Sequence, residues 1–333
     1  MAKIDKKRII EIDVARAVAI MAVVLIHVSS FAFAKSTLGT VDSRISLFLN
    51  QISRFSVPLF VFISGVGLSL GYKKEKGYFY FLSKRLRKVV PSYLVWGLIY
   101  VIVINQNYDI STWPKLFLKG DKIYYHLYFI PMIITLYLLF PIFYSKIKKF
   151  SWAFFLFVIT SIIIGTSHYF NIPNLKLDFF SKRNALFWSG YFVLGVYISD
   201  GINNLVEFAK HNKKKVTILM VLSTVIIVME SFLNIKYGKT IDYATTFIRP
   251  TVIIYFIFIT LYIFSRSYKE GSWVLKIFHN ISKRSFGIYL IHPFILYYYM
   301  KLFQFLNFNI GSLFFIITSF FVCIIIPIFL VKN

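Results

Sequence analysis

Apolar segments of nearly uniform length recur along the whole chain and restrict its fold more than any other feature. Each is about 16 to 22 residues long, which is the length an α-helix needs to cross a bilayer. Because a backbone in lipid must satisfy its own hydrogen bonds, we expect every segment to be helical. The expected spans lie near residues 12–33, 56–72, 89–105, 127–145, 151–169, 185–200, 215–233, 248–265, 285–303 and 312–331.

The composition agrees with an integral membrane protein. Hydrophobic residues make up 58% of the chain and charged residues 15%, whereas a soluble domain of this size is less apolar and more charged. The net charge of +25 would suggest nucleic-acid binding in a soluble protein. Here the basic residues lie in short clusters between apolar runs, so we expect contacts with membrane lipids and no nucleic acid. Residues 1–333 are expected to form a single integral membrane domain.

The basic clusters also predict how the helices are oriented. Most of the 38 lysine and arginine residues fall on one side of a ten-span arrangement, near residues 3–8, 73–88, 146–149, 210–215, 266–284 and 332. The positive-inside rule makes this side cytoplasmic and places both termini there. The first apolar run continues to Phe33 without a clear signal-peptide cleavage site, so we expect it to be a retained span. The predicted fold is an all-α bundle of about ten transmembrane helices.

The first span carries two residues that are costly in a lipid-facing helix, Arg16 and His27. Eleven helical positions advance about 1100°, close to three turns, and rise about 16 Å. The two side chains therefore share one helix face, with Arg16 near the start of the span and His27 about half a bilayer further in. This face is predicted to line a site where a cytoplasmic anionic donor meets an acceptor. Alternatively, His27 is a buried histidine satisfied by a neighbouring helix, and Arg16 extends to the interface or pairs with Asp13.

Other polar residues are candidates for substrate binding. Glu230 in the seventh span and Arg249 near the start of the eighth are intramembrane charges that we expect on the outer side, where they would pair. Trp113 belongs to an interfacial aromatic belt or stacks on a sugar ring. The single cysteine and the spacing of the six histidines match no pattern of metal ligands, so no metal is predicted.

Several motifs, taken together, resemble the acyltransferase family 3 of membrane proteins. The residues from Ile12 to His27 are similar to that family's opening span, in which an arginine precedes a histidine by eleven positions. Further stretches agree in order along almost the whole chain: 58–65, 84–91, 126–130, 191–195 and 285–293. One stretch departs from the pattern. The family's third-span motif often contains two arginines, and here the matching pair is Arg85 and Lys88, of which the lysine cannot form a bidentate contact to phosphate.

The resemblance implies an activity and its participants. It implies transfer of an acyl group, usually acetyl, from cytoplasmic acyl-CoA to a hydroxyl of a surface glycan or a lipid-linked saccharide in the bacterial cytoplasmic membrane. Arg16, Arg85 and Lys88 would bind the phosphates of CoA at the cytoplasmic mouth. His27 would take a proton from the acceptor hydroxyl or carry the acyl group itself. We expect no permanently bound cofactor, since acetyl-CoA is the donor substrate.

Two other functions remain open at this point. A transporter or flippase for a glycan intermediate would also need many spans and intramembrane charges, although the chain shows no clear inverted repeat. An export partner without catalytic activity is the third possibility.

Overall fold

The computed structural model describes residues 9–146, 150–169 and 184–331, and these residues are all-helical. Every apolar segment expected from the sequence coincides with a helix. The long helices are α1 (Ile10–Lys35), α3 (Ser56–Gly71), α4 (Gly77–Ile99), α6 (Phe129–Lys146), α7 (Phe150–Tyr169), α8 (Ala185–Ile198), α10 (Lys213–Lys236), α12 (Pro250–Phe264), α13 (Trp273–Phe305) and α14 (Leu313–Leu330). The shorter ones are α2 (Val41–Ile52), α5 (Trp113–Lys119), α9 (Ile202–His211) and α11 (Ile241–Thr245).

Seven helical segments of the described chain are long and apolar enough to cross a membrane. They are Ile10–Lys35, Val41–Gly71, Lys74–Ile104, Ala185–His211, Lys213–Lys236, Ile241–Phe264 and Leu313–Leu330, and Phe129–Tyr144 and Trp152–Thr166 are shorter apolar helices. The expected span 285–303 lies within the longer α13, which also carries lysine, arginine and histidine residues. The chain is thus a multi-pass membrane protein, while ten spans and cytoplasmic termini stay predictions.

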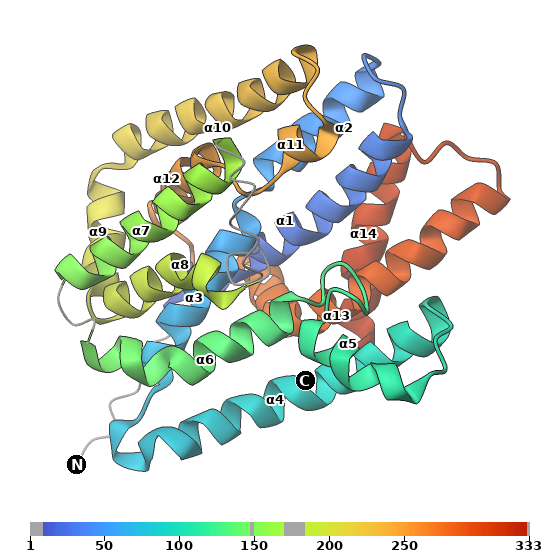
Figure 1. Ribbon diagram of the computed structural model, residues 1–333. Helices are drawn as coiled ribbons and strands as arrows, with labels where there is room; N and C mark the ends of the chain where they lie inside the picture. Colours follow the sequence, from blue (N-terminus) through green and yellow to red (C-terminus); the bar gives the residue numbers. More distant parts are fainter. Residues whose placement is uncertain (1–8, 147–149, 170–183, 332–333) are drawn as a thin grey trace.

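Helix α1 runs through the middle of the bundle, and α4 and α10 lie at opposite edges of it (Figure 1). Helix α1 packs against α2, α3, α13 and α14, among others. Of the 26 residues of α1, those that are buried occur on every side of the helix. By contrast, α10 buries only Val216, Ser223, Ile227 and Ser231. This difference makes α1 a core helix and α10 a peripheral one, whose remaining apolar surface suits contact with lipid.

Two glycines allow α3 and α8 to approach unusually closely. A β-carbon added at Gly65 would lie 2.2 Å from the carbonyl oxygen of Phe192, and one added at Gly195 would lie 2.1 Å from that of Phe62. Each helix thus presents a glycine to the backbone of the other. Close contacts of this kind hold membrane helices together, because an apolar side chain is as stable against lipid as against another helix. The same contact supports a packing role for Gly65 in the segment 58–65.

Two stretches that the sequence assigned to loops are helical. Residues 73–88 were expected between spans, but α4 begins at Gly77, so Arg85 and Lys88 lie on a helix. Residues 34–55 separate the expected spans 12–33 and 56–72, but they contain α2. Helix α2 is too polar to be recognised by hydropathy, and it buries Ser43, Ser46, Asn50 and Gln51. Hydropathy misses it because most of its buried residues are hydrogen-bonded polar groups, beside the apolar Leu47.

Candidate active site

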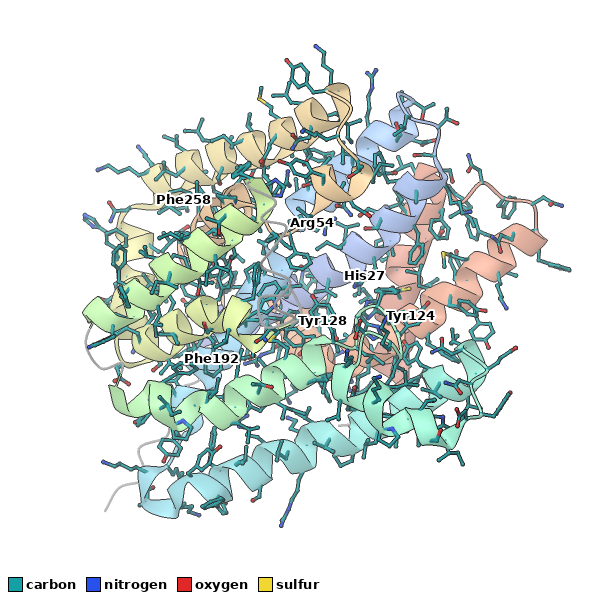
Figure 2. All side chains as sticks on the ribbon, in the orientation of Figure 1. His27, Arg54, Tyr124, Tyr128, Phe192 and Phe258 are labelled. Carbon is teal, nitrogen blue, oxygen red and sulfur yellow. The ribbon has the colours of Figure 1, made fainter. Side chains whose placement is uncertain are left out.

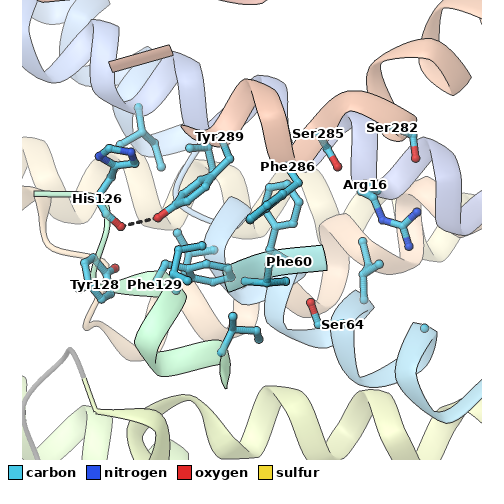
Figure 3. Close-up of a pocket in the computed structure, with 18 of the residues that line it drawn as sticks. Arg16, Phe60, Ser64, His126, Tyr128, Phe129, Ser282, Ser285, Phe286 and Tyr289 are labelled. Atoms are coloured by element: carbon cyan, nitrogen blue, oxygen red, sulfur yellow. Dashed lines mark hydrogen bonds between the residues drawn. The ribbon is translucent and has the colours of Figure 1, made fainter. Parts of the chain in front are cut away.

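A cavity of about 630 Å³ lies at the centre of the bundle. Its walls come from α1, α3, α4, α6 and α13 and from the segment that precedes α6. Figure 3 shows Arg16 at one end of the cavity and His126 at the other, with Phe60 and Phe286 between them. Four residues predicted from the sequence line this cavity: Arg16, His27, Arg85 and Lys88. The cavity therefore joins charged groups and an imidazole from helices far apart in the sequence.

The two predicted residues of α1 face the cavity together. Arg16 and His27 both line it, as the helical spacing requires. The His27 ring is half-buried and contacts two other rings, with its centroid 4.8 Å from that of Tyr125 and 5.4 Å from that of His292. His27 therefore has one side against aromatic rings and an edge open to the cavity.

Arg16 also has the partner that the sequence suggested as an alternative. Its Nη1 lies 3.5 Å from Oδ1 of Asp13, one turn earlier on α1. Ser282 of α13 donates a hydrogen bond of 3.2 Å to the same oxygen, and Nδ1 of His279 lies 3.8 Å from the other. Arg16 can therefore pair with Asp13 and still line the cavity. Asp13 is itself bonded to Ser282 of α13 and holds the guanidinium in place.

Arg16 and Arg85 meet at α3. Nη2 of Arg85 lies 3.5 Å from the carbonyl oxygen of Gly67, and a β-carbon at Gly67 would lie 3.8 Å from Nη2 of Arg16. Lys88 and Lys283 line the cavity as well. Phosphate groups bind to clusters of this kind through charge-assisted hydrogen bonds. This end of the cavity, which we call the cationic end, thus has the chemistry of an anion site.

The other end is built by the segment between α5 and α6. Tyr125, His126 and Tyr128 line the cavity there. His126 is 3% exposed, its backbone oxygen accepts a hydrogen bond from Tyr289, and its ring centroid lies 5.8 Å from that of His292 (Figure 3). Tyr125 and Tyr128 thus add aromatic rings to the wall of the cavity. Within the described parts of the chain, no group of histidine, cysteine and carboxylate side chains has the geometry of a metal site.

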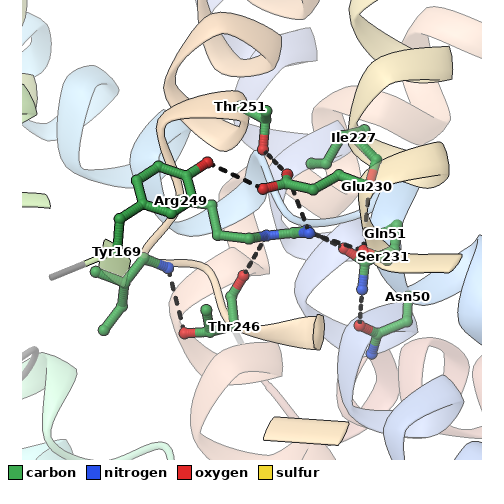
Figure 4. A network of polar contacts seen from close by, with 10 residues as sticks. Asn50, Gln51, Tyr169, Ile227, Glu230, Ser231, Thr246, Arg249 and Thr251 are labelled. Atoms are coloured by element: carbon green, nitrogen blue, oxygen red, sulfur yellow. Dashed lines mark hydrogen bonds and ion pairs between the residues drawn. The ribbon is translucent and has the colours of Figure 1, made fainter. Parts of the chain in front are cut away.

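Glu230 and Arg249 form the ion pair that their positions suggested, but they lie outside the cavity lining. Their closest atoms are 3.2 Å apart, and Arg249 is fully buried. The guanidinium donates to the carbonyl of Thr246, to Ser231 and to Gln51 (Figure 4). Because all three of its nitrogens are engaged, the arrangement favours a structural role for Arg249. Substrate binding by the pair stays a prediction.

Trp113 also lies outside the cavity lining. It begins α5 and packs, partly buried, against the apolar cluster beside the segment 123–130. Stacking of Trp113 on a sugar ring thus stays a prediction that the cavity does not support.

Sequence reasoning missed one charged residue of the cavity, Arg54. It lies in the turn between α2 and α3, in the stretch that separates the expected spans 12–33 and 56–72. Its position four residues before Pro58, at the start of an apolar run, was the available signal. The turn between α2 and α3 is buried, so the charged side chain of Arg54 lies inside the bundle.

The arrangement has the parts that group transfer requires: a cluster of cations suited to an anion, an imidazole, and one cavity that both of them line. A family model described as an acyltransferase domain, the acyltransferase family 3 model, matches residues 9–332. Searches of curated proteins and of solved structures give no significant match. The chain therefore belongs to acyltransferase family 3 and is a membrane acyltransferase.

Proposed function

We propose that the protein transfers an acetyl group from cytoplasmic acetyl-CoA to a hydroxyl of a surface polysaccharide or a lipid-linked glycan precursor. One observation carries the proposal: Arg16, Arg85 and Lys88 line the same cavity as His27. CoA combines several phosphate charges with a long, thin pantetheine arm, so its binding site needs cations at one end and a narrow path to the thioester. Bacterial origin and the cytoplasmic membrane belong to the same proposal.

The donor would bind with its phosphates at the cationic end. Arg16 and Arg85 approach Gly67 from two helices, and a phosphate between them would accept hydrogen bonds from both guanidinium groups. His27 lies about 16 Å further along α1 than Arg16. The pantetheine arm would extend over this distance along the apolar wall formed by Phe60 and Phe286.

His27 would act as the base for the acceptor hydroxyl. The imidazole takes the hydroxyl proton while the oxygen attacks the thioester carbonyl, and a tetrahedral intermediate forms. When the intermediate collapses, the carbon–sulfur bond breaks and the CoA sulfur receives the proton from His27. In the other order of events, His27 attacks the thioester first and passes the acetyl group to the acceptor. Both routes yield free CoA and an acetyl ester.

The acceptor would occupy the end of the cavity near Tyr125 and Tyr128. Aromatic rings suit the apolar faces of sugar rings, and both tyrosines line the wall beside His27. This placement puts the acceptor hydroxyl on the side of the thioester opposite the phosphates.

Acetyl transfer in proteoliposomes tests the proposal. The purified chain receives labelled acetyl-CoA on its basic face and a panel of glycan acceptors, and the natural chain is compared with His27→Ala. We expect labelled acceptor with the natural chain and a loss of about 100-fold or more with the variant. The exposed His211 of α9 provides the matched control, since His211→Ala should retain full activity.

Binding of acetyl-CoA is measured in the same samples. Retained binding by His27→Ala shows that the variant is folded and that the loss concerns the reaction. If transfer survives in His27→Ala, His27 is not the base. If acetyl-CoA neither binds nor is consumed, a transporter or export partner for a glycan becomes the better explanation.

A further inference from the structure

Arg54 is a buried cation of the cavity to which the proposed reaction assigns no role. The residue is 9% exposed and lines the cavity that also holds His27 and Tyr128. All three lie in the centre of the bundle (Figure 2). A charge at this depth needs a counter-charge or several hydrogen bonds to be stable.

The hydrogen bonds of Arg54 are incomplete. Nη2 donates to Oδ1 of Asn50, whereas Nε is buried and has no partner. Asn50 in turn donates to Oγ of Ser30 at 2.7 Å and to the carbonyl of Ile26 at 3.2 Å. Arg54 is therefore fixed, through Asn50, to the turn of α1 that carries His27, and its guanidinium lines the cavity with an incomplete set of hydrogen bonds.

The neighbouring charges do not neutralise Arg54. The partly buried carboxylate of Glu230 pairs with Arg249 (Figure 4). Arg249 connects through Gln51 to Asn50, so one polar network contains two guanidinium groups and a single carboxylate. No carboxylate among the described residues forms an ion pair with Arg54. The network thus has an unbalanced positive charge at the cavity wall.

Arg54 lies far from the cationic end of the cavity. It lies two residues before the start of α3, whereas Arg16 and Arg85 approach Gly67, eleven residues beyond the first residue of that helix. Eleven residues correspond to about 16 Å of helix. A donor whose phosphates occupy the cationic end would have its thioester near His27. An anion beside Arg54 would then belong to the acceptor.

We propose that Arg54 binds an anionic group, a carboxylate or a phosphate, on the acceptor saccharide while the acceptor hydroxyl lies at His27. The assignment of this anion to the acceptor rests on the proposed function, whereas the anion site itself rests on the cavity and the burial of Arg54. The site selects acidic or phosphorylated glycans over neutral ones, because a neutral ligand would leave the charge buried and unpaired. Arg54 acts here as a binding residue for the acceptor.

Ligand-induced stabilisation tests the site without an acyl-transfer assay. The full chain in detergent is saturated with CoA, which occupies the cationic end, and its unfolding midpoint is measured with glucuronate, glucose 1-phosphate or glucose at constant ionic strength. We expect one or both charged sugars to raise the midpoint above the value in glucose. In Arg54→Gln this difference should disappear, and in Arg54→Lys it should be reduced.

Arg44→Gln is the matched control, because Arg44 is an exposed arginine of the neighbouring α2 that does not line the cavity. It should keep the natural response. The CoA-induced shift in each variant shows that the variant is folded. Equal midpoints with all three sugars in the natural chain, or an unchanged response in Arg54→Gln, would overturn the proposal. A glucuronate response alone identifies a carboxylate, and a glucose 1-phosphate response alone identifies a phosphate.

Kinetics separate this role from a direct effect on the reaction. With acceptor saccharides matched except for the charged group, Arg54→Gln should raise the KM of the charged acceptor at least tenfold and leave that of the neutral acceptor unchanged. An equal fall in kcat for both would mean that Arg54 stabilises the oxyanion, which contradicts the proposal. If CoA gives no stabilisation while the sugar response depends on Arg54, the proposed function fails and the anion site remains.

Discussion

The imidazole of His27 stacks on that of His292, with ring centroids 5.4 Å apart and an interplanar angle of 27°. His292 is fully buried on α13, and its Nδ1 donates to the carbonyl of Ile288 at 2.8 Å. The carbonyl can only accept, so this bond leaves Nε2 as the nitrogen without a proton in the neutral ring. A buried ring fixed by its own helix thus supports the candidate base in the cavity.

This contact predicts that His292 positions His27. Replacement by alanine removes the supporting ring, and a displaced base lowers kcat by roughly 10- to 100-fold. His292→Phe keeps a flat ring and should retain more activity than His292→Ala, while the KM of acetyl-CoA stays unchanged in both. Steady-state transfer kinetics measure the effect. Equal loss in the two variants would show that the nitrogen atoms matter more than the packing.

Arg85 is predicted to contribute more to donor binding than Lys88. Arg85 is partly buried beside Gly67, whereas Lys88 is exposed at the edge of the cavity, where water screens its charge. Arg85→Gln should raise the dissociation constant of acetyl-CoA by about tenfold or more, the loss expected for one hydrogen bond to a charged group. Lys88→Gln should have a smaller effect, measured by titration calorimetry.

Arg87 of the same helix supplies the control, because it is exposed and does not line the cavity. Arg87→Gln removes the same charge and should leave donor affinity close to that of the natural chain. Equal weakening by all three variants would mean that the donor responds to the overall charge of the face and not to a defined site.

The Glu230–Arg249 pair is predicted to stabilise the fold. Glu230→Gln leaves Arg249 buried without its counter-charge, which should lower the free energy of unfolding by about 3 kcal/mol. Thermal unfolding in detergent measures the change, with the exposed Glu207 of α9 as control through Glu207→Gln. If stability is unchanged and the KM of a glycan acceptor rises instead, the substrate-binding role suggested by the sequence is correct.

Gly65 is predicted to be intolerant of a methyl group. In Gly65→Ala the new β-carbon meets the Phe192 carbonyl, so α3 and α8 must separate, at a cost of about 1–3 kcal/mol. Gly201→Ala is the control, since no atom lies within 4 Å of a β-carbon at that position. A lower unfolding midpoint in the first variant alone is expected. Equal midpoints would show that the two helices have room to adjust.

Properties that depend on one helix at a time could be predicted from the sequence. Apolar length located the helices, because the bilayer sets how many residues a span needs. Helical periodicity placed Arg16 and His27 on one face, because the repeat of 3.6 residues is a local property of the backbone. Family motifs added Arg85 and Lys88, and all four residues line one cavity.

Properties that depend on how distant helices pack could not be predicted in this way. Hydropathy places Glu230 and Arg249 within or beside spans and leaves Arg54 between two spans, but it does not say which of them faces a cavity. The packing decides this: Glu230 and Arg249 form the expected pair outside the cavity lining, whereas Arg54 lines the cavity and its Nε has no hydrogen-bond partner. The sequence by itself determined which segments are helices and which residues share a helix face, and the tertiary structure decided which charges meet, because those contacts join residues nearly 200 positions apart, as between Gln51 and Arg249.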